Sequence, residues 1–112
     1  MQQGRELSFD GYQERAVATC SPRQTLATLG LGLCGEAGEL ANKLEKMMAQ
    51  GHVLEGEALR DELGDCLWYL AVLAHCFGLS LSEVASRNVE KLAKRYPEGS
   101  FSEEASRNRP SE

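Results

Sequence analysis

The sequence predicts an all-α domain built as a four-helix bundle. Apolar residues recur every three or four positions through most of the chain, which is the period of a helix that buries one face. Serine, glycine and proline separate the periodic segments, as is typical of helix ends. The 112 residues suffice for one domain with a core of its own. We therefore expect a single helical domain over residues 1–97 and a polar tail over residues 98–112.

The first predicted helix covers residues 8–20 and ends at a serine-proline pair. The second covers residues 23–50, and Gly51 ends it before a short loop at residues 52–56. The apolar stripe of this second helix consists of Leu26, Leu29, Leu33, Ala37, Leu40, Leu44 and Met48. Because these residues share one side of the helix, that side is predicted to face the core.

The third predicted helix covers residues 57–77 and stops at Gly78. Its apolar face consists of Leu59, Leu63, Cys66, Leu70, Leu73 and Phe77. The second half of this helix is apolar nearly all round, which in so short a chain favours burial against another subunit. We therefore expect Trp68 to lie in the core or at a subunit interface, and the bundle to be completed or extended in a homodimer or homotetramer.

The fourth predicted helix opens at Ser80, which forms a capping-box pattern with Glu83, and it ends before Pro97. The residues that follow are polar and have few apolar anchors. We expect this tail to be loosely docked or disordered.

Composition excludes several classes of function. A net charge of −5 and a pI near 5.1 argue against a nucleic-acid surface, which needs a basic patch. No apolar run reaches the roughly 18 residues that span a membrane, and the first residues lack the apolar core of a signal peptide. The four cysteines have no C-x-x-C spacing, which favours reduced thiols. We therefore expect a cytoplasmic protein with neither nucleic acid nor membrane as a partner.

Two acid pairs are the strongest functional signal, Glu36 with Glu39 on the second helix and Glu62 with Asp65 on the third. Helical residues three apart point in directions about 60° apart, so each pair can aim two carboxylates at one point. If the two helices pack antiparallel, the four carboxylates converge, and their mutual repulsion calls for a cation. Hard oxygen ligands favour Mg²⁺, with Mn²⁺ as a substitute. Solvated surface charge is the alternative for either pair alone.

Glycines support a specialised site beside these acids. Gly30, Gly32, Gly35 and Gly38 crowd the second helix, and Gly64 lies inside the second acid pair. Each glycine in a helix interior costs about 0.5–1 kcal/mol relative to alanine. Either a tight helix crossing or room for a metal and a phosphate group explains that cost.

The fourth helix carries a complementary charge. Asn88, Lys91 and Arg95 share one ridge at spacings of three and four, beside the apolar stripe of that helix. The two cations can reach phosphate oxygens, and Asn88 can bond an oxygen, a water or a base edge. A solvated basic flank is the alternative. Lys43, one turn after Glu39, is expected to pair with that glutamate outside the site.

Three segments carry a family resemblance: LCGEAGEL at residues 33–40, DELGDCLWYL at 61–70 and NVEKLAKRYP at 88–97. Together they resemble the MazG-like nucleotide pyrophosphohydrolases of the all-α NTP pyrophosphatase superfamily, over about residues 12–101. The family pattern is E-x-x-E, a spacer, then E-x-x-D, and 22 residues separate the two pairs here. The resemblance implies hydrolysis of a nucleoside triphosphate to the monophosphate and pyrophosphate.

The resemblance also implies roles for single residues. The four acids Glu36, Glu39, Glu62 and Asp65 would hold Mg²⁺. The ridge of Asn88, Lys91 and Arg95 would contact the nucleotide. The chemistry of the residues, rather than the resemblance, suggests Glu39 as the acid that orients or deprotonates the attacking water, because it lies furthest from the core on its helix. Some relatives that cleave dUTP carry an additional acid right after the first glutamate, where this chain has Ala37, so the base preference and the number of metals stay open.

Three alternatives compete with that interpretation. A di-iron carboxylate bundle needs Glu-x-x-His pairs, and neither acid pair is followed by a histidine. A non-catalytic helical oligomer would leave the matched acids and the glycines unexplained. A module that senses nucleotide or metal could share the same scaffold.

Overall fold

The computed structural model describes residues 6–50 and 56–108, and every regular element within those ranges is a helix. In chain order the helices are α1 (Phe9–Ala18), α2 (Leu26–Gln50), α3 (Gly56–Cys76), α4 (Leu81–Arg95) and α5 (Glu103–Arg107). The predicted all-α class is therefore confirmed. Residues 51–55, where the second helix was predicted to end and a loop to follow, lie outside the described residues.

Helix starts follow local capping chemistry. The Ser80 hydroxyl accepts a hydrogen bond from the Glu83 amide, and Glu83 accepts one from the Ser80 amide, which completes the predicted capping box of α4. Helix α2 begins three residues later than predicted. Residues 21–24 form a turn instead, and the Thr25 hydroxyl then accepts from the Thr28 amide at 3.1 Å, as a helix cap does.

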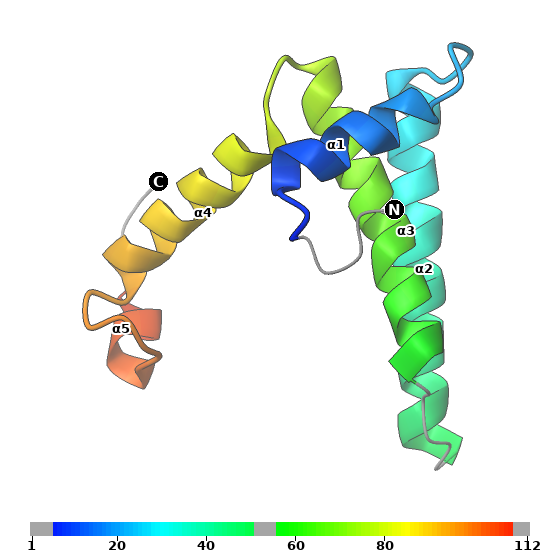
Figure 1. The fold of residues 1–112 in the computed structure, drawn as a ribbon. Coiled ribbons are helices and arrows are strands. Elements are labelled where there is room, and N and C mark those ends of the chain that lie inside the picture. Colours follow the sequence, from blue (N-terminus) through cyan, green and yellow to red (C-terminus); the bar gives the residue numbers. More distant parts are fainter. Residues whose placement is uncertain (1–5, 51–55, 109–112) are drawn as a thin grey trace.

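Helices α2 and α3 form an antiparallel pair, and α1 lies across the end of that pair where α2 begins and α3 ends (Figure 1). Helix α4 leaves α3 at a bend of 101° and runs away from the pair, carrying α5 at its far end. One chain alone therefore does not close the predicted four-helix bundle.

The core sits where α1 crosses the pair and α4 begins. It contains Ala16, Leu29, Ala71, Val72 and Leu81, of which Ala71 is fully buried. Tyr12, Trp68 and Tyr69 pack around it. This core lies at one end of the long α2–α3 pair, so the remainder of the pair has little of its own chain to pack against.

Buried Gln13 ties α1 to the corner between α3 and α4. Its amide nitrogen donates to the Ala71 and Leu79 carbonyls at 3.0 and 3.1 Å, and its oxygen accepts from the Leu81 amide at 3.0 Å. Asp10 accepts from the Ser82 amide at 3.0 Å. Two side chains of α1 thus satisfy amides at the start of α4 and hold the direction in which α4 departs.

The predicted tail contains an ordered helix. Ser102 caps α5 by accepting from the Ala105 amide at 3.0 Å, and the Phe101 ring lies against Tyr96 with 5.7 Å between ring centroids. Residues 103–107 of the predicted tail therefore form a short helix. Among the described residues, no single helix is long and apolar enough to cross a membrane, and α3 and α4 satisfy that test only as a pair taken across their bend.

Candidate metal centre

Three of the four predicted carboxylates converge between α2 and α3. Glu36 on α2 and the pair Glu62 and Asp65 on α3 each place one oxygen within 4.8 Å of the others. The antiparallel packing of the two helices brings the pairs together, as their positions beside the apolar faces required. This spacing suits ligands that share one cation.

Glu62 is the best-shielded member of this carboxylate cluster, with 9% of the residue exposed. One of its oxygens, Oε2, accepts a 2.8 Å hydrogen bond from the Lys43 ammonium. The other, Oε1, is buried and finds no hydrogen-bond partner among the described residues. A buried carboxylate oxygen without a donor is costly, and it is the kind of atom that a divalent cation would satisfy.

The pKa of Glu36 is raised above its ordinary value. Loss of hydration is the largest cause, followed by repulsion from Asp65, Glu39 and Glu62 and by the hydrogen bond that a protonated Glu36 shares with Asp65. The negative charges of the neighbouring carboxylates are therefore not fully neutralised at Glu36. A cation would relieve that repulsion.

Glu39 lies outside the group of three. Its side chain is exposed one turn further along α2, but its charge still contributes to the raised pKa of Glu36 and of Lys43. The structure thus places Glu39 close enough to act on the cluster electrostatically, without making it a member.

The predicted nucleotide contacts Asn88, Lys91 and Arg95 lie on α4, which diverges from α2 and α3 (Figure 1). Asn88 is exposed, and Lys91 and Arg95 are half-buried. The Arg95 Nε atom is buried with no hydrogen-bond partner among the described residues. Within one chain, therefore, the fold does not bring this basic ridge to the carboxylates.

Two further residues belong to the surroundings of the cluster. Lys43 pairs with Glu62 on α3 rather than with Glu39 as predicted, because the α2–α3 packing places the buried carboxylate within its reach. Tyr12 on α1 has a raised pKa, chiefly from burial and then from the charge of Asp65. The helical position of Lys43 beside Glu39 could have indicated its role, whereas no local signal connects Tyr12 with a residue on α3.

The glycines divide into two groups. A Cβ at Gly32 would overlap the ring of Tyr69, so this position serves a close helix crossing. The four remaining glycines near the acids, Gly30, Gly35, Gly38 and Gly64, would meet nothing within 4 Å. The tight helix crossing thus explains Gly32, whereas a side chain at the other four positions would meet open space.

Trp68 packs within its own chain. Its indole N–H donates to the Thr19 hydroxyl at 2.8 Å, and its ring meets Tyr69 edge to face at 4.9 Å between centroids. Of the two expected locations, core and subunit interface, these contacts place it against the core. The exposed apolar residues of α3 lie elsewhere on the helix.

Comparison with known proteins places this carboxylate cluster in a family context. The chain matches the MazG nucleotide pyrophosphohydrolase domain over residues 24–100, which contain α2, α3 and α4. It is also 39% identical over 84 residues to a protein described as the Gene 37 protein of Mycobacterium phage L5, across 71% of this chain and 74% of the phage protein. No solved structure shows significant similarity to the chain. The chain therefore belongs to the MazG nucleotide pyrophosphohydrolase domain family.

Proposed function

We propose that this protein hydrolyses a nucleoside triphosphate or its deoxy form to the monophosphate and pyrophosphate, with Mg²⁺ as cofactor and Mn²⁺ as a substitute. One observation carries the proposal: the buried, unpartnered Oε1 of Glu62 stands among three converging carboxylates in a chain of this family. Water attacks the α-phosphorus, and the bond to the pyrophosphate group breaks.

The charge of the cluster favours a divalent cation. The ionised carboxylates of Glu36, Glu62 and Asp65 carry three negative charges, and the Lys43 ammonium offsets one of them. The negative charge that remains is the kind that Mg²⁺ would balance. When bound, the ion would polarise the phosphoryl oxygens and favour an activated water.

The chain's own residues take distinct parts in this proposal. Glu36, Glu62 and Asp65 hold the ion, and exposed Glu39 orients or deprotonates the attacking water from the adjoining turn. Asn88, Lys91 and Arg95 bind the triphosphate, where two cations relieve the charge that develops on the departing pyrophosphate. The net charge of −5 supports action on a small molecule rather than on nucleic acid.

Pyrophosphate release from a panel of nucleotides, with Mg²⁺, Mn²⁺ or a chelator present, tests this function. We expect release only with metal, and a loss of at least about a hundredfold in Glu39→Gln and Asp65→Asn, because one removes the proton acceptor and the other a metal ligand. Glu45→Gln, on an exposed part of α2, is the matched control and should retain full activity.

Two outcomes would contradict the proposal. Orthophosphate as the first product would move the attack away from the α-phosphorus, and full activity of Asp65→Asn would remove the metal centre. Thermal unfolding provides an independent check, because a ligand that binds the folded state raises the melting temperature. Mn²⁺ should raise it for the natural chain and leave it unchanged for Glu62→Gln.

A further inference from the structure

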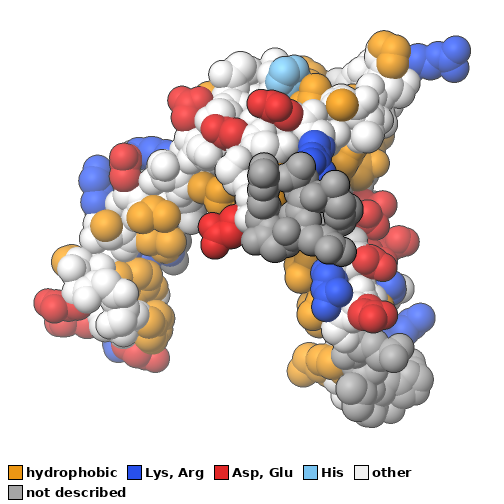
Figure 2. All heavy atoms as spheres, viewed as in Figure 1, with side chains coloured by type: hydrophobic (Ala, Val, Ile, Leu, Met, Phe, Trp, Pro, Cys, Tyr) orange, Lys and Arg blue, Asp and Glu red, His pale blue; other side chains and the backbone are white. Residues whose placement is uncertain are grey.

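Lys43 is a cation that the fold brings to the carboxylate cluster. It lies seven residues after Glu36 on α2, about two helical turns away and on the same side of the helix. Its ammonium donates to Oε2 of Glu62 across the α2–α3 contact, at 2.8 Å. Figure 2 shows Lys and Arg side chains beside Asp and Glu along the arm that α2 and α3 form, so acidic and basic groups are close neighbours there within one chain.

The two oxygens of Glu62 differ in what they contact. Oε2 accepts the hydrogen bond from Lys43, whereas Oε1 is buried and has no hydrogen-bond partner among the described residues. The Glu62 side chain is only 12% exposed, so water has little access to it. One oxygen of this carboxylate is therefore already bound to a cation, and the other is left for a ligand bond.

This difference between the two oxygens limits how Glu62 can bind metal. A carboxylate that holds one ion through both oxygens, or that joins two ions with one oxygen on each, needs both oxygens free. Centres with two metal ions place them about 3.5–4 Å apart, which is close enough for one carboxylate to join them. Because Lys43 already occupies Oε2, Glu62 has only Oε1 to offer and does not join two ions in this way.

The surroundings of the Lys43 ammonium suit a positive charge. The pKa of Lys43 is raised, first by its hydrogen bond to Glu62 and also by the negative charges of Glu62, Glu39 and Asp61, although desolvation opposes this rise. The carboxylates around the ammonium thus stabilise a cation at this point. A divalent ion at Oε2 would lie close to the ammonium, and the two positive charges would repel each other.

We propose that Lys43 takes the place of a second divalent ion, so that this centre binds a single ion, through the free oxygen of Glu62 together with Glu36 and Asp65. Lys43 is then a positioning residue, because it acts through Glu62 and contacts neither the ion nor the reacting atoms. This inference rests on the metal centre of the proposed function, but it does not depend on which substrate the centre serves.

Counting the Mn²⁺ ions that the protein binds tests this inference without any enzyme activity. Isothermal titration calorimetry should give one ion for each natural chain. It should give two for each chain of Lys43→Met, whose side chain has a similar length but no donor for Oε2. Lys43→Arg keeps a cationic donor and should still bind one ion. Lys46→Met, on an exposed part of α2, is the matched control and should also bind one.

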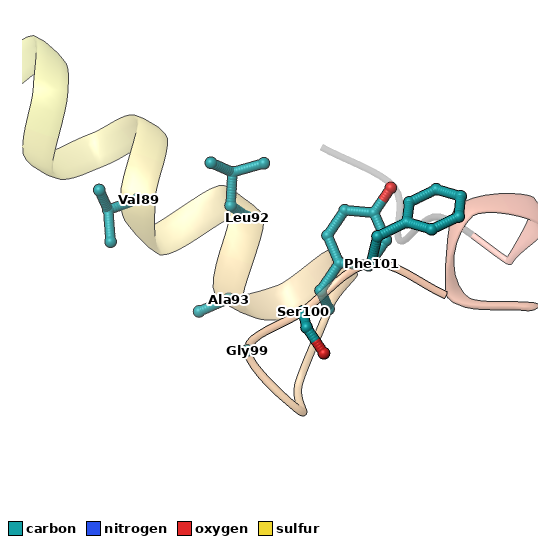
Figure 3. Close-up of a pocket in the computed structure, with 7 residues that line it drawn as sticks. Val89, Leu92, Ala93, Gly99, Ser100 and Phe101 are labelled. Atoms are coloured by element: carbon teal, nitrogen blue, oxygen red, sulfur yellow. The ribbon is translucent and has the colours of Figure 1, made fainter. Parts of the chain in front are cut away.

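Electron paramagnetic resonance distinguishes a shared centre from a second ion bound elsewhere on the protein. Two Mn²⁺ ions that share Glu62 lie close enough for their electron spins to couple. The spectrum of Lys43→Met should therefore show a coupled pair, and that of the natural chain should show isolated ions. The groove on α4 does not disturb this count, because its lining residues, among them Val89, Leu92 and Phe101, carry no charge that would hold a metal ion (Figure 3).

Two coupled ions on the natural chain, or a single ion on a folded Lys43→Met chain, overturn the proposal. Lys43→Ser, whose side chain is too short to reach Oε2, is a second variant that should bind two ions. If circular dichroism shows that neither variant folds, Lys43 is a purely structural residue and the proposal is overturned as well. A natural chain that binds one ion but releases no pyrophosphate from any nucleotide overturns the proposed hydrolysis alone, whereas a natural chain that binds no ion overturns both.

Discussion

Gly32 and Tyr69 show how one residue sets the distance between two helices. The ring of Tyr69 occupies the space in which any Cβ at position 32 would lie. We expect Gly32→Ala to destabilise the protein by about 1–3 kcal/mol, because the ring must move out of a packed position. Urea unfolding followed by circular dichroism measures this change.

Gly30→Ala is the matched control, two positions away on the same helix. A Cβ there meets nothing within 4 Å, so the substitution should stabilise the protein by about 0.5–1 kcal/mol through helix propensity alone. Equal effects at both positions would show that the Tyr69 ring yields without cost.

Lys43 partly neutralises the metal centre. Its hydrogen bond to Glu62 is the largest cause of its raised pKa, so the ammonium is held in its charged form beside the carboxylates. Lys43→Met leaves Glu62 without this partner. We therefore expect this variant to melt at a lower temperature than the natural chain in chelator. We also expect Mn²⁺ to raise its melting temperature by more, because the carboxylates then carry more negative charge that the ion neutralises.

The comparison for this prediction is Lys46→Met, three positions along on an exposed part of α2. That change should alter neither the melting temperature in chelator nor the response to Mn²⁺. If Lys43→Met responds to the metal no more than the natural chain, Lys43 does not share the charge of the centre.

At the scale of elements, α1 determines where α4 points. Gln13 makes three hydrogen bonds to the α3–α4 corner, and Asp10 accepts one from α4. Gln13→Met has a similar size but leaves two carbonyls and one amide without their partner. We expect a loss of at least about 2 kcal/mol in the free energy of unfolding, measured by urea denaturation.

Glu14→Gln supplies the comparison on the same helix, because Glu14 is exposed. It should change stability by less than about 0.5 kcal/mol. A small effect of Gln13→Met would mean that water replaces the lost hydrogen bonds and that the direction of α4 is held by apolar packing alone.

At the scale of the whole molecule, the open shape of one chain predicts that folding and association are coupled. If the exposed apolar residues of α3 and α4, such as Leu70 and Val89, are buried between two copies of the chain, the urea midpoint rises with protein concentration. Each tenfold increase should add about 1.4 kcal/mol of apparent stability. Denaturation curves over a wide range of concentrations measure this, and coincident curves would show that the single chain is the stable unit.

The sequence predicted the elements well because their signals are local. The capping pair of α4, the break at the serine-proline pair after α1 and the stop near Cys76 depend on neighbours a few residues away. The apolar spacing on α3 predicted a core face that the fold leaves partly exposed, because Leu63 and Phe77 are 50% and 66% exposed whereas Val72, on the opposite side of the helix, is buried in the core. Period alone identifies an apolar face but not what covers it, because it does not distinguish a partner in the same chain from one in another.

The sequence alone determined the all-α class, the limits of four helices within about three residues, and the two acid pairs with their family resemblance. Tertiary structure decided which atoms meet: Glu36 joins Glu62 and Asp65, Glu39 stays at the margin, Lys43 turns to Glu62, and α4 carries its cations away from its own acids. The physical reason is the distance along the chain over which each kind of interaction acts. Caps and helical periodicity act between residues within one or two turns, whereas the meeting of α2 with α3 and the departure of α4 depend on packing and on long-range hydrogen bonds such as those of Gln13.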